Sequence, residues 1–233
     1  MHQPAATPRT QAEEFLTREM ATLVIYEQAR QSFSHVSGWL HPAEGFLLMR
    51  LASATNAMPA GAVVEIGSFK GLSTCWLASG LRSVRSRTGA DAGKVFAIDH
   101  FTGSPEHQAG GKFEDAEIVK HGSTLPLFRE NIQKAGLTDL VEVVQAGSLE
   151  AVKTWSGAPI RLLFIDGDHS YEATRDDFAA WSKFVPVGGY TCFHDVNTWE
   201  GVTRFVKELM ADPSRRFITV MGAASLLVAR RIA

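Results

Sequence analysis

The amino-acid sequence predicts an α/β fold built on a mostly parallel sheet of seven strands, with helices on both faces and further helices at the N-terminus. Three observations lead to this prediction. Short apolar runs rich in β-branched residues alternate with longer runs in which apolar residues recur at about helical spacing. The first five apolar runs end in glycine or aspartate. The length of 233 residues suits one domain with a full-sized core.

The N-terminal part of the chain contains no strand-like run. Residues 1–10 are rich in Pro, Ala and Thr and are expected to form a disordered tail. Residues 11–60 are expected to form a helical segment. Apolar residues recur at helical spacing in 15–26, and a second helical run follows at 44–56.

Residues 61–233 carry the alternation of strands and helices and are expected to form the main domain. The expected strands are 62–67, 94–99, 141–147, 160–166, 188–195, 215–221 and 225–232, the last one antiparallel. The expected helices are 72–84, 125–136, 149–155, 171–184 and 201–209. Residues 100–123 are rich in glycine and are expected to be an irregular insert, where functional loops tend to occur. The alternation of strands and helices over residues 61–233 is typical of a Rossmann-like sheet.

Composition excludes several classes of protein. Lys and Arg total 23 against 25 Asp and Glu, so the basic excess of a nucleic-acid-binding protein is missing. No apolar run reaches the roughly 18–20 residues of a membrane span, and the first residues lack the apolar core of a secretory signal. Cys75 and Cys192 are too few for a disulfide framework. We therefore expect a cytoplasmic protein with no nucleic-acid or membrane partner.

Polar residues or glycines follow five of the expected strands. In open parallel sheets, ligands bind beyond the carboxyl ends of the strands, where the strand order reverses. A single polar strand end means little, but a series across five strands is hard to obtain by accident. The strand ends are 65–67, 99–100, 146–148, 166–169 and 194–195. They predict a ligand site along this edge of the sheet.

The first loop, 65–73, has the pattern Glu-x-Gly-x-x-x-Gly. Glycine lets a backbone approach a ligand closely, and the following helix presents free N–H groups to an anion. The loop matches neither a nucleoside triphosphate loop nor the G-x-G-x-x-G of a dinucleotide site, and a plain strand-to-helix turn is the alternative. Asp99 ends the second strand and is expected to accept ribose hydroxyls, with a helix N-cap as the alternative.

Three stretches resemble class I S-adenosylmethionine-dependent methyltransferases: VVEIGSFKGLST, AIDHFTG and FIDGDHSYEATRDDFAAWSKFVPVGGYTCFHDV. The third is similar to the branch that contains macrolide-sugar and rhamnosyl O-methyltransferases and catechol-type O-methyltransferases. The resemblance covers about residues 60–230 and implies S-adenosyl-L-methionine as cofactor. The cofactor residues that it implies are Glu65, Gly67, Ser68, Gly71 and Ser73 at the methionine end, Asp99 at the ribose, Gly147 and Ser148 at the adenine, and Asp166. We expect Gly67→Val to block cofactor binding without unfolding the protein.

The resemblance also implies a reaction site. His169 lies at the offset from Asp166 that holds the general base in metal-using relatives, and Asp166 and Asp195 match their metal carboxylates. Catechol-type relatives have Asn directly after the second metal aspartate, whereas Val196 stands here. His194 precedes Asp195 where sugar-methylating relatives often have Glu. We therefore expect a divalent metal of the Mg or Mn type at Asp166, His194 and Asp195, and the histidine suits Mn²⁺, Fe²⁺ or Zn²⁺ better than Mg²⁺.

The function that follows is an S-adenosylmethionine-dependent O-methyltransferase that acts on a hydroxyl of a small molecule: a sugar, a natural product or a phenol. A sulfonium donor needs no activation, but the acceptor must lose a proton. A histidine with an ordinary pKa near ~6.5 can take that proton, and a metal can lower the acceptor's pKa. For His169 a helix cap or a structural partner of Asp168 is the alternative.

Two other classes of protein remain open. A nicotinamide-dependent oxidoreductase on a similar fold predicts G-x-G-x-x-G and a Tyr-x-x-x-Lys pair, both missing from the sequence. A non-catalytic cofactor-binding protein is the other alternative. Trp199, His100 and His107 are further candidates for contact with the acceptor. The expected partners are a small-molecule acceptor and a second copy of the chain, bound through the N-terminal helices.

Overall fold

The computed structural model describes residues 10–55, 57–214 and 216–233. The expected disordered tail lies outside the described residues except for Thr10. Thr10 caps the first helix, α1 (Gln11–Ser32): its hydroxyl accepts from the backbone N–H of Glu13 at 3.2 Å, and the Glu13 carboxylate accepts from the N–H of Thr10 at 2.7 Å. Thr10 therefore belongs to the helical segment.

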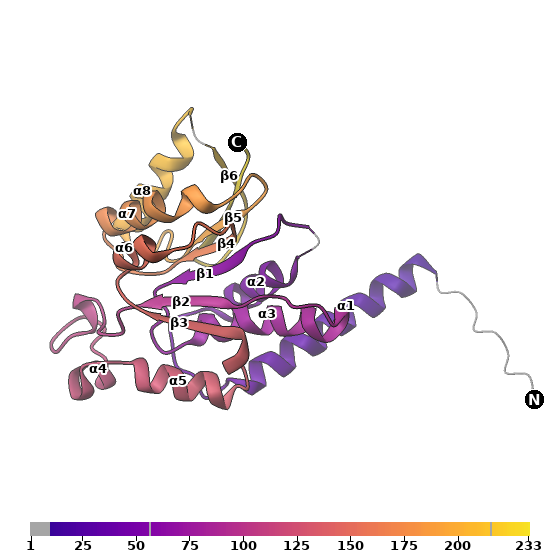
Figure 1. Cartoon of the computed structure of the whole chain (residues 1–233), viewed down its shortest axis with the longest axis horizontal. Coiled ribbons are helices and arrows are strands. Elements are labelled where there is room, and N and C mark those ends of the chain that lie inside the picture. Colours follow the sequence, from indigo (N-terminus) through magenta and orange to yellow (C-terminus); the bar gives the residue numbers. More distant parts are fainter. Residues whose placement is uncertain (1–9, 56, 215) are drawn as a thin grey trace, which may run out of the picture.

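The sheet has the predicted Rossmann-like topology, with seven strands among the described residues (Figure 1). The strands are β1 (Ala62–Ile66), β2 (Val95–Asp99), β3 (Val141–Gln145), β4 (Ile160–Ile165), β5 (Tyr190–Phe193), β6 (Phe217–Ala223) and β7 (Leu226–Arg231). Their order is β3-β2-β1-β4-β5-β7-β6. Strand β7 runs antiparallel to both of its neighbours, β5 and β6, and the other neighbouring strands are parallel. The order reverses between β1 and β4, so a ligand site is expected at the carboxyl ends of these two strands and of β2 and β5.

Helices cover both faces of the sheet, as predicted (Figure 1). They are α2 (Pro42–Ser53), α3 (Leu72–Thr88), α4 (Ala116–His121), α5 (Leu125–Lys134), α6 (Ser148–Ala151), α7 (Tyr171–Trp181) and α8 (Glu200–Ala211). Successive strand residues face opposite layers: Val63 packs in the cluster formed with α2, α3 and α5, and Val64 in the cluster formed with α6, α7 and α8. None of the described helices is long and apolar enough to cross a membrane.

The second N-terminal helix is part of the main core. Leu48 and Ala52 of α2 are fully buried in the same cluster as Leu77 of α3. A Cβ atom placed on Gly45 would lie 2.2 Å from Nε1 of Trp76, so glycine is required for this close approach of the two helices. The predicted boundary at residue 60 thus separates two sequence patterns but not two hydrophobic cores.

The insert at 100–123 is more regular than expected. It contains a single 3-10 turn at Pro105–His107 and the short helix α4. The Asp115 side chain caps α4 by accepting from the backbone N–H groups of Glu117 and Ile118. Asp115 also forms a buried ion pair with Lys70, which lies in the loop after β1. The insert is thereby fixed to the loop that was expected to bind the cofactor.

Candidate functional site

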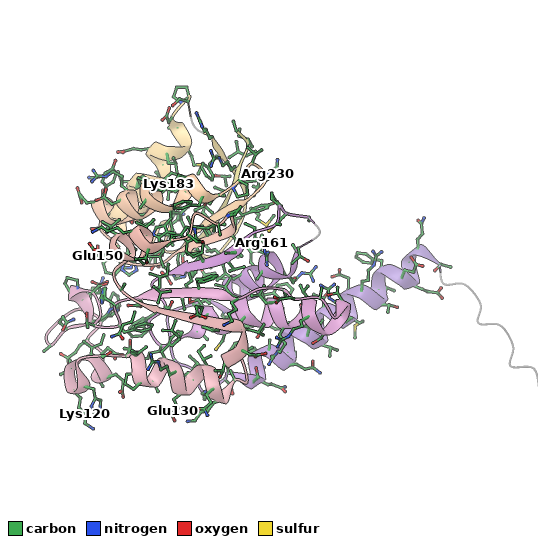
Figure 2. All side chains as sticks on the ribbon, viewed as in Figure 1. Lys120, Glu130, Glu150, Arg161, Lys183 and Arg230 are labelled. Carbon is green, nitrogen blue, oxygen red and sulfur yellow. The ribbon has the colours of Figure 1, made fainter. Side chains whose placement is uncertain are left out.

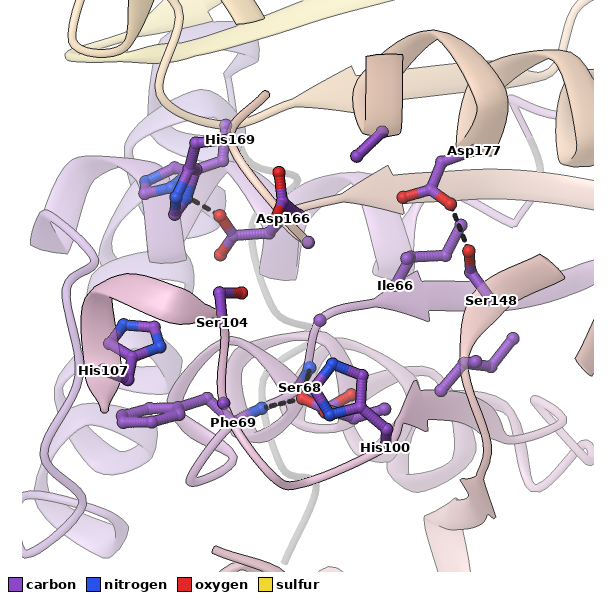
Figure 3. A pocket seen from close by; sticks show the side chains of 18 of the residues that line it. Ile66, Ser68, Phe69, His100, Ser104, His107, Ser148, Asp166, His169 and Asp177 are labelled. Carbon is purple, nitrogen blue, oxygen red and sulfur yellow. Dashed lines mark hydrogen bonds and ion pairs between the residues drawn. The ribbon is translucent and has the colours of Figure 1, made fainter. Parts of the chain in front are cut away.

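A cavity of about 850 Å³ lies at the carboxyl ends of β1, β2, β4 and β5 (Figure 3). Its size is in the range of small-molecule sites. Seven of the nine predicted cofactor residues line it: Gly67, Ser68, Ser73, Asp99, Gly147, Ser148 and Asp166. Glu65 and Gly71 are not among the lining residues.

Glu65 lies beneath the loop after β1 rather than in the cavity. Its side chain is fully buried and accepts hydrogen bonds from the hydroxyls of Ser68, at 2.8 Å, and Thr74. Burial raises the pKa of Glu65 to about 7, against the opposing effect of these hydroxyls. In this structure the Glu65 carboxylate therefore holds the loop from below, and its predicted contact with the cofactor stays a prediction.

Gly67 has a different role from the one expected. Its φ is +83°, and a Cβ atom placed there would lie 2.0 Å from the backbone oxygen of Asp166. A side chain at position 67 would therefore collide with the backbone after β4, rather than fill the space that the cofactor would occupy. The expectation that Gly67→Val blocks cofactor binding without unfolding the protein is corrected, because any side chain at 67 pushes the ends of β1 and β4 apart.

Asp99 organises the loop and also lines the cavity. Its Oδ2 accepts from the backbone N–H groups of Ser68 at 2.9 Å and Phe69 at 2.7 Å, and its Oδ1 from that of Phe101 at 2.6 Å. A carboxylate has about four acceptor positions, so about one is left for a ribose hydroxyl. The predicted ribose contact and the alternative structural role are therefore compatible.

Asp177 of α7 was not predicted as a site residue. It lines the cavity at the end formed by Ser148, whose hydroxyl donates to Oδ1 of Asp177 (Figure 3). Burial, opposed by the Ser148 bond and reinforced by the charges of Asp168 and Asp176, raises the pKa of Asp177 to about 6. In the sequence, Asp177 is indistinguishable from the other charged residues of an amphipathic helix.

Asp166, His169 and Asp195 come together on the opposite side of the cavity. Asp166 follows β4 and Asp195 follows β5, which are adjacent strands, as predicted. One ligand atom from each of the three side chains lies within 4.8 Å of those of the other two. Nε2 of His169 lies 3.1 Å from Oδ2 of Asp195.

His194 occupies a different position from the one expected of a metal ligand. Its Nδ1 lies 2.9 Å from Oδ1 of Asp166, and its Nε2 lies 3.1 Å from Oε2 of Glu44. Burial disfavours the charged ring, but Asp166, Asp195 and Glu44 together raise its pKa well above the ordinary range. Both ring nitrogens of His194 thus face carboxylates, whereas the side chains whose ligand atoms converge are those of Asp166, His169 and Asp195. The assignment of His194 as a metal ligand stays a prediction.

Glu44 links the N-terminal segment to this corner of the site. It is 2% exposed, and its Oε1 accepts from the N–H and the hydroxyl of Ser225 at 2.7 and 2.8 Å. Burial opposes its ionisation, but the bonds from His194, His41 and Ser225 lower the pKa of Glu44 to about 2. The sequence showed Glu44 only as an acidic residue in the first turn of a helix.

The insert contributes His100, Gly103, Ser104, His107 and Phe113 to the lining of the cavity. Glu106 lies behind this lining, with its Oε1 2.9 Å from Nδ1 of His169. His107 stacks on Trp39, with ring centroids 5.2 Å apart and planes at 11°, and on Phe69, at 5.1 Å and 28°. Of these, only His100 and His107 had been considered, as candidate contacts for the acceptor.

A family model described as a methyltransferase domain matches residues 64–196, which is more than half of the chain. The chain belongs to the methyltransferase family. Catechol O-methyltransferase of Mycobacterium tuberculosis is 33% identical to this methyltransferase over 179 residues, which cover 77% of this chain and 66% of that protein. The alignment thus spans about two thirds of the relative's length.

Solved structures share the fold of this methyltransferase. The O-methyltransferase NovP is 22% identical, with a TM-score of 0.62 over 81% of this chain and 79% of that one. An O-methyltransferase from Bacillus cereus in complex with SAH is 20% identical, with a TM-score of 0.57 over 89% and 91%. The resemblance seen in the sequence and the predicted fold class are thereby confirmed.

The cavity of the methyltransferase fits S-adenosylmethionine. Helix α3 begins beside the cavity at Leu72 and Ser73, and no side chain caps its N-terminus, so its first N–H groups are available to a carboxylate. Asp99 has acceptor capacity left for a ribose hydroxyl, and Ser148 and Asp177 provide polar groups at the far end. Asp166, Asp195 and His169 form a donor set of two carboxylates and an imidazole, which suits a divalent cation.

Aromatic rings form a continuous wall on one side of the methyltransferase cavity. His107 stacks on Trp39 and on Phe69, Trp39 makes tilted contacts with Phe69 and Phe113, and Phe113 contacts Trp199 at a centroid distance of 5.8 Å. Trp199 in turn lies parallel to the ring of His169, with centroids 4.6 Å apart and planes at 10°. Trp199 lines the cavity, and its expected contact with the acceptor stays a prediction, whereas Trp39 had not been singled out.

Proposed function

We propose that this methyltransferase transfers the methyl group of S-adenosylmethionine to a hydroxyl of a small, planar aromatic acceptor. The observation that supports it most is the aromatic wall, which runs from Trp39 to Trp199 and ends on His169 beside two carboxylates. The five rings are brought together from four different loops, and a flat aromatic acceptor would gain dispersion and stacking along the wall. A sugar would instead require a set of hydrogen-bonding groups on that side.

His169 is proposed as the general base. Glu106, beside Nδ1, holds the ring so that Nε2 faces Asp195 and the reaction site. Trp199 packs flat on the ring and limits its rotation. Once Asp195 binds the cation instead of His169, Nε2 would be free to take the proton of the acceptor hydroxyl, and the oxygen would attack the methyl carbon in line with the departing sulfur.

Asp166 and Asp195 are proposed to hold a divalent cation close to the acceptor oxygen. Bound there, a divalent cation supplies positive charge that favours the ionised form of the acceptor. His194, protonated and held by Glu44, keeps the Asp166 carboxylate in place from behind. In this proposal His169 is the base and not the third ligand.

The acceptor class is tested by incubating the protein with labelled S-adenosylmethionine and two sets of acceptors. Catechols and simple phenols form one set, and nucleotide-linked deoxysugars form the other. Methylated phenolic products support the proposal, and methylated sugars alone contradict it. No product from either set, together with tight S-adenosylhomocysteine binding by calorimetry, would favour a non-catalytic cofactor-binding protein.

The roles of His169 and the cation are separated by one variant and two measurements. His169→Ala should lower kcat by about 10²–10⁴-fold, the usual contribution of a general base, and leave the affinity for Mn²⁺ unchanged in calorimetric titration. EDTA should abolish activity, and Asp195→Ala should abolish Mn²⁺ binding. Loss of Mn²⁺ binding in His169→Ala would make His169 a ligand, and full activity in EDTA would remove the cation from the reaction.

The proposal includes a cytoplasmic location. Cys75 and Cys192 are both free and buried, which agrees with a compartment where thiols remain reduced. Fractionation of the native cells with an antibody against the chain would test it.

A further inference from the structure

The end of the cavity beside α7 is the space left for the base of the donor. The donor's amino-acid carboxylate would meet the first N–H groups of α3, and its ribose would meet Asp99 at the end of β2. The base is attached to the ribose and lies on the side away from the reacting sulfur. The walls that remain there are the segment after β3, residues 146–150, and the first two turns of α7.

Acidic side chains line this end of the cavity, and one of them is buried. Asp177 is 6% exposed. The other carboxylates at this end are exposed or half-buried, and they belong to Glu150, Asp168, Glu172 and Asp176. A buried polar group in the wall of a ligand cavity is of the kind that fixes the orientation of a ligand.

The two oxygens of the Asp177 carboxylate have different surroundings. Oδ1 accepts from the hydroxyl of Ser148, whereas no N–H or O–H of the described residues donates to Oδ2 (Figure 3). A Cβ atom placed on Gly167 would lie 3.2 Å from Oδ2 and 3.6 Å from Cγ2 of Ile66. The φ of Gly167 lies outside the left-handed region, so the backbone itself does not require glycine there. The missing side chain keeps the space beside Oδ2 open.

An ionised carboxylate is unfavourable at this position unless a second donor reaches it. Burial and the charges of Asp168 and Asp176 disfavour the ionised form, and the bond from Ser148 opposes them in part. The resulting pKa of Asp177 is about 6, so at pH 8 the group is mostly ionised and can only accept hydrogen bonds. An N–H group of a ligand at Oδ2 would supply the missing partner.

We propose that Asp177 selects the base of the donor, by accepting a hydrogen bond from the 6-amino group of adenine at Oδ2. Ile66 and Ile98, which are both buried and line the cavity, would pack against the flat ring. A base with an oxygen at position 6 would set its lone pairs against those of the carboxylate, because the ribose and the amino-acid end hold the base in place. The inference rests on S-adenosylmethionine as the donor.

Calorimetric titration of the full chain at pH 8 tests the role of Asp177. The two probes are S-adenosylhomocysteine and S-inosylhomocysteine, which carries an oxygen in place of the 6-amino group. The parent should bind the adenine compound about tenfold or more tightly than the inosine compound, the usual worth of a hydrogen bond to a charged group. Asp177→Asn keeps the shape and an oxygen for Ser148 but presents an amide N–H to position 6. In this variant the preference should fall to within about threefold or reverse.

Two neighbouring carboxylates serve as matched controls, because both line the same end of the cavity but already have partners. Glu150, at the left of Figure 2, is 69% exposed and lies 2.6 Å from Nζ of Lys153. Asp176 accepts from Nε of Arg175 at 2.8 Å. Glu150→Gln and Asp176→Asn should keep the preference of the parent.

The outcomes separate the base contact from the choice of donor. Equal binding of the two compounds by the parent, or an unchanged preference in Asp177→Asn, would overturn the role of Asp177 and leave the donor as proposed. If the parent binds neither compound, the donor itself is wrong, and the base contact fails with it. None of these measurements depends on methyl transfer or on the identity of the acceptor.

Discussion

Oε1 of Glu106 lies 2.9 Å from Nδ1 of His169, although Glu106 follows β2 and His169 follows β4. Strand β1 lies between these two strands in the sheet, so the insert reaches across the end of β1 to make the contact. The ring of His169 is consequently held on both nitrogens, by Glu106 at one and by Asp195 at the other. Its orientation depends on a segment distant in sequence.

Glu106→Ala should lower kcat by about 10–10²-fold, the usual effect of losing a group that orients a reacting side chain. Glu106→Gln keeps an oxygen that accepts from Nδ1–H and should retain most of the activity. The affinity for S-adenosylhomocysteine, measured by calorimetry, should not change in either variant. Glu117→Ala, in the same insert but exposed, is the control. Equal rates for Glu106→Ala and Glu117→Ala would remove Glu106 from the reaction.

Gly67→Ala should destabilise the fold. The positive φ and the contact with the Asp166 backbone together are expected to cost about 2–6 kcal/mol in the free energy of unfolding, measured with urea. Gly147→Ala is the control, because its φ is −63° and a Cβ atom there meets nothing within 4 Å. Equal unfolding midpoints for the two variants would show that the ends of β1 and β4 separate easily.

Asp99→Ala should weaken S-adenosylhomocysteine binding by about 2–4 kcal/mol, through the loss of a charge-assisted bond and of the order in the loop. Amide hydrogen exchange should report the second effect, with faster exchange at Ser68 and Phe69 in the absence of ligand. Asp91→Ala, in an exposed turn before β2, should change neither quantity. An unchanged dissociation constant in folded Asp99→Ala protein would contradict the ribose assignment.

Asp177→Asn should raise stability at neutral and alkaline pH. The pKa of Asp177 in the fold is about 6, above its ordinary value near ~3.9, so the folded state binds this proton more tightly than the unfolded state. The stabilising effect of this protonation is complete below about pH 4 and is lost as the pH rises through 6. The free energy of unfolding of the variant should therefore exceed that of the parent by on the order of 2–3 kcal/mol at pH 8 and by little at pH 4. If the free energies of unfolding of variant and parent differ by the same amount at every pH from 4 to 8, the raised pKa of Asp177 is ruled out.

Trp39→Ala should raise the KM for a phenolic acceptor by about 3–10-fold, the worth of one aromatic stacking contact, with a smaller effect on kcat. The dissociation constant of S-adenosylhomocysteine serves as the internal control and should stay the same. If that constant rises as much as the acceptor KM, the aromatic wall belongs to the cofactor side of the cavity.

The seven strands, the antiparallel last strand and the meeting of Asp166 with Asp195 were predictable from the sequence. Parallel strands such as β1 and β4 are buried on both faces and read as continuous apolar runs, and polar residues at their ends must lie at one edge of the sheet. A resemblance to one family supplied the roles of these residues. The first helices and the final strand pair were also placed to within a few residues.

The missed residues reach the site from outside this pattern. Glu44 lies in a helix 150 positions before His194, and Glu106 lies in an insert with no regular period. Both look like ordinary surface charges until the tertiary fold buries them. The contact of His194 with Glu44 was missed for the same reason: the buried carboxylate that engages its second nitrogen cannot be seen from the residues next to His194 in the sequence.

The ion pair between Lys70 and Asp115 joins the loop that would receive the donor to the segment that lines the acceptor side. The stacking of Phe69 on His107 is a second contact between the same two segments. If donor binding orders the loop, these two contacts would order the 3-10 turn that carries Glu106 and His107 as well, and the acceptor would then lose less conformational entropy on binding.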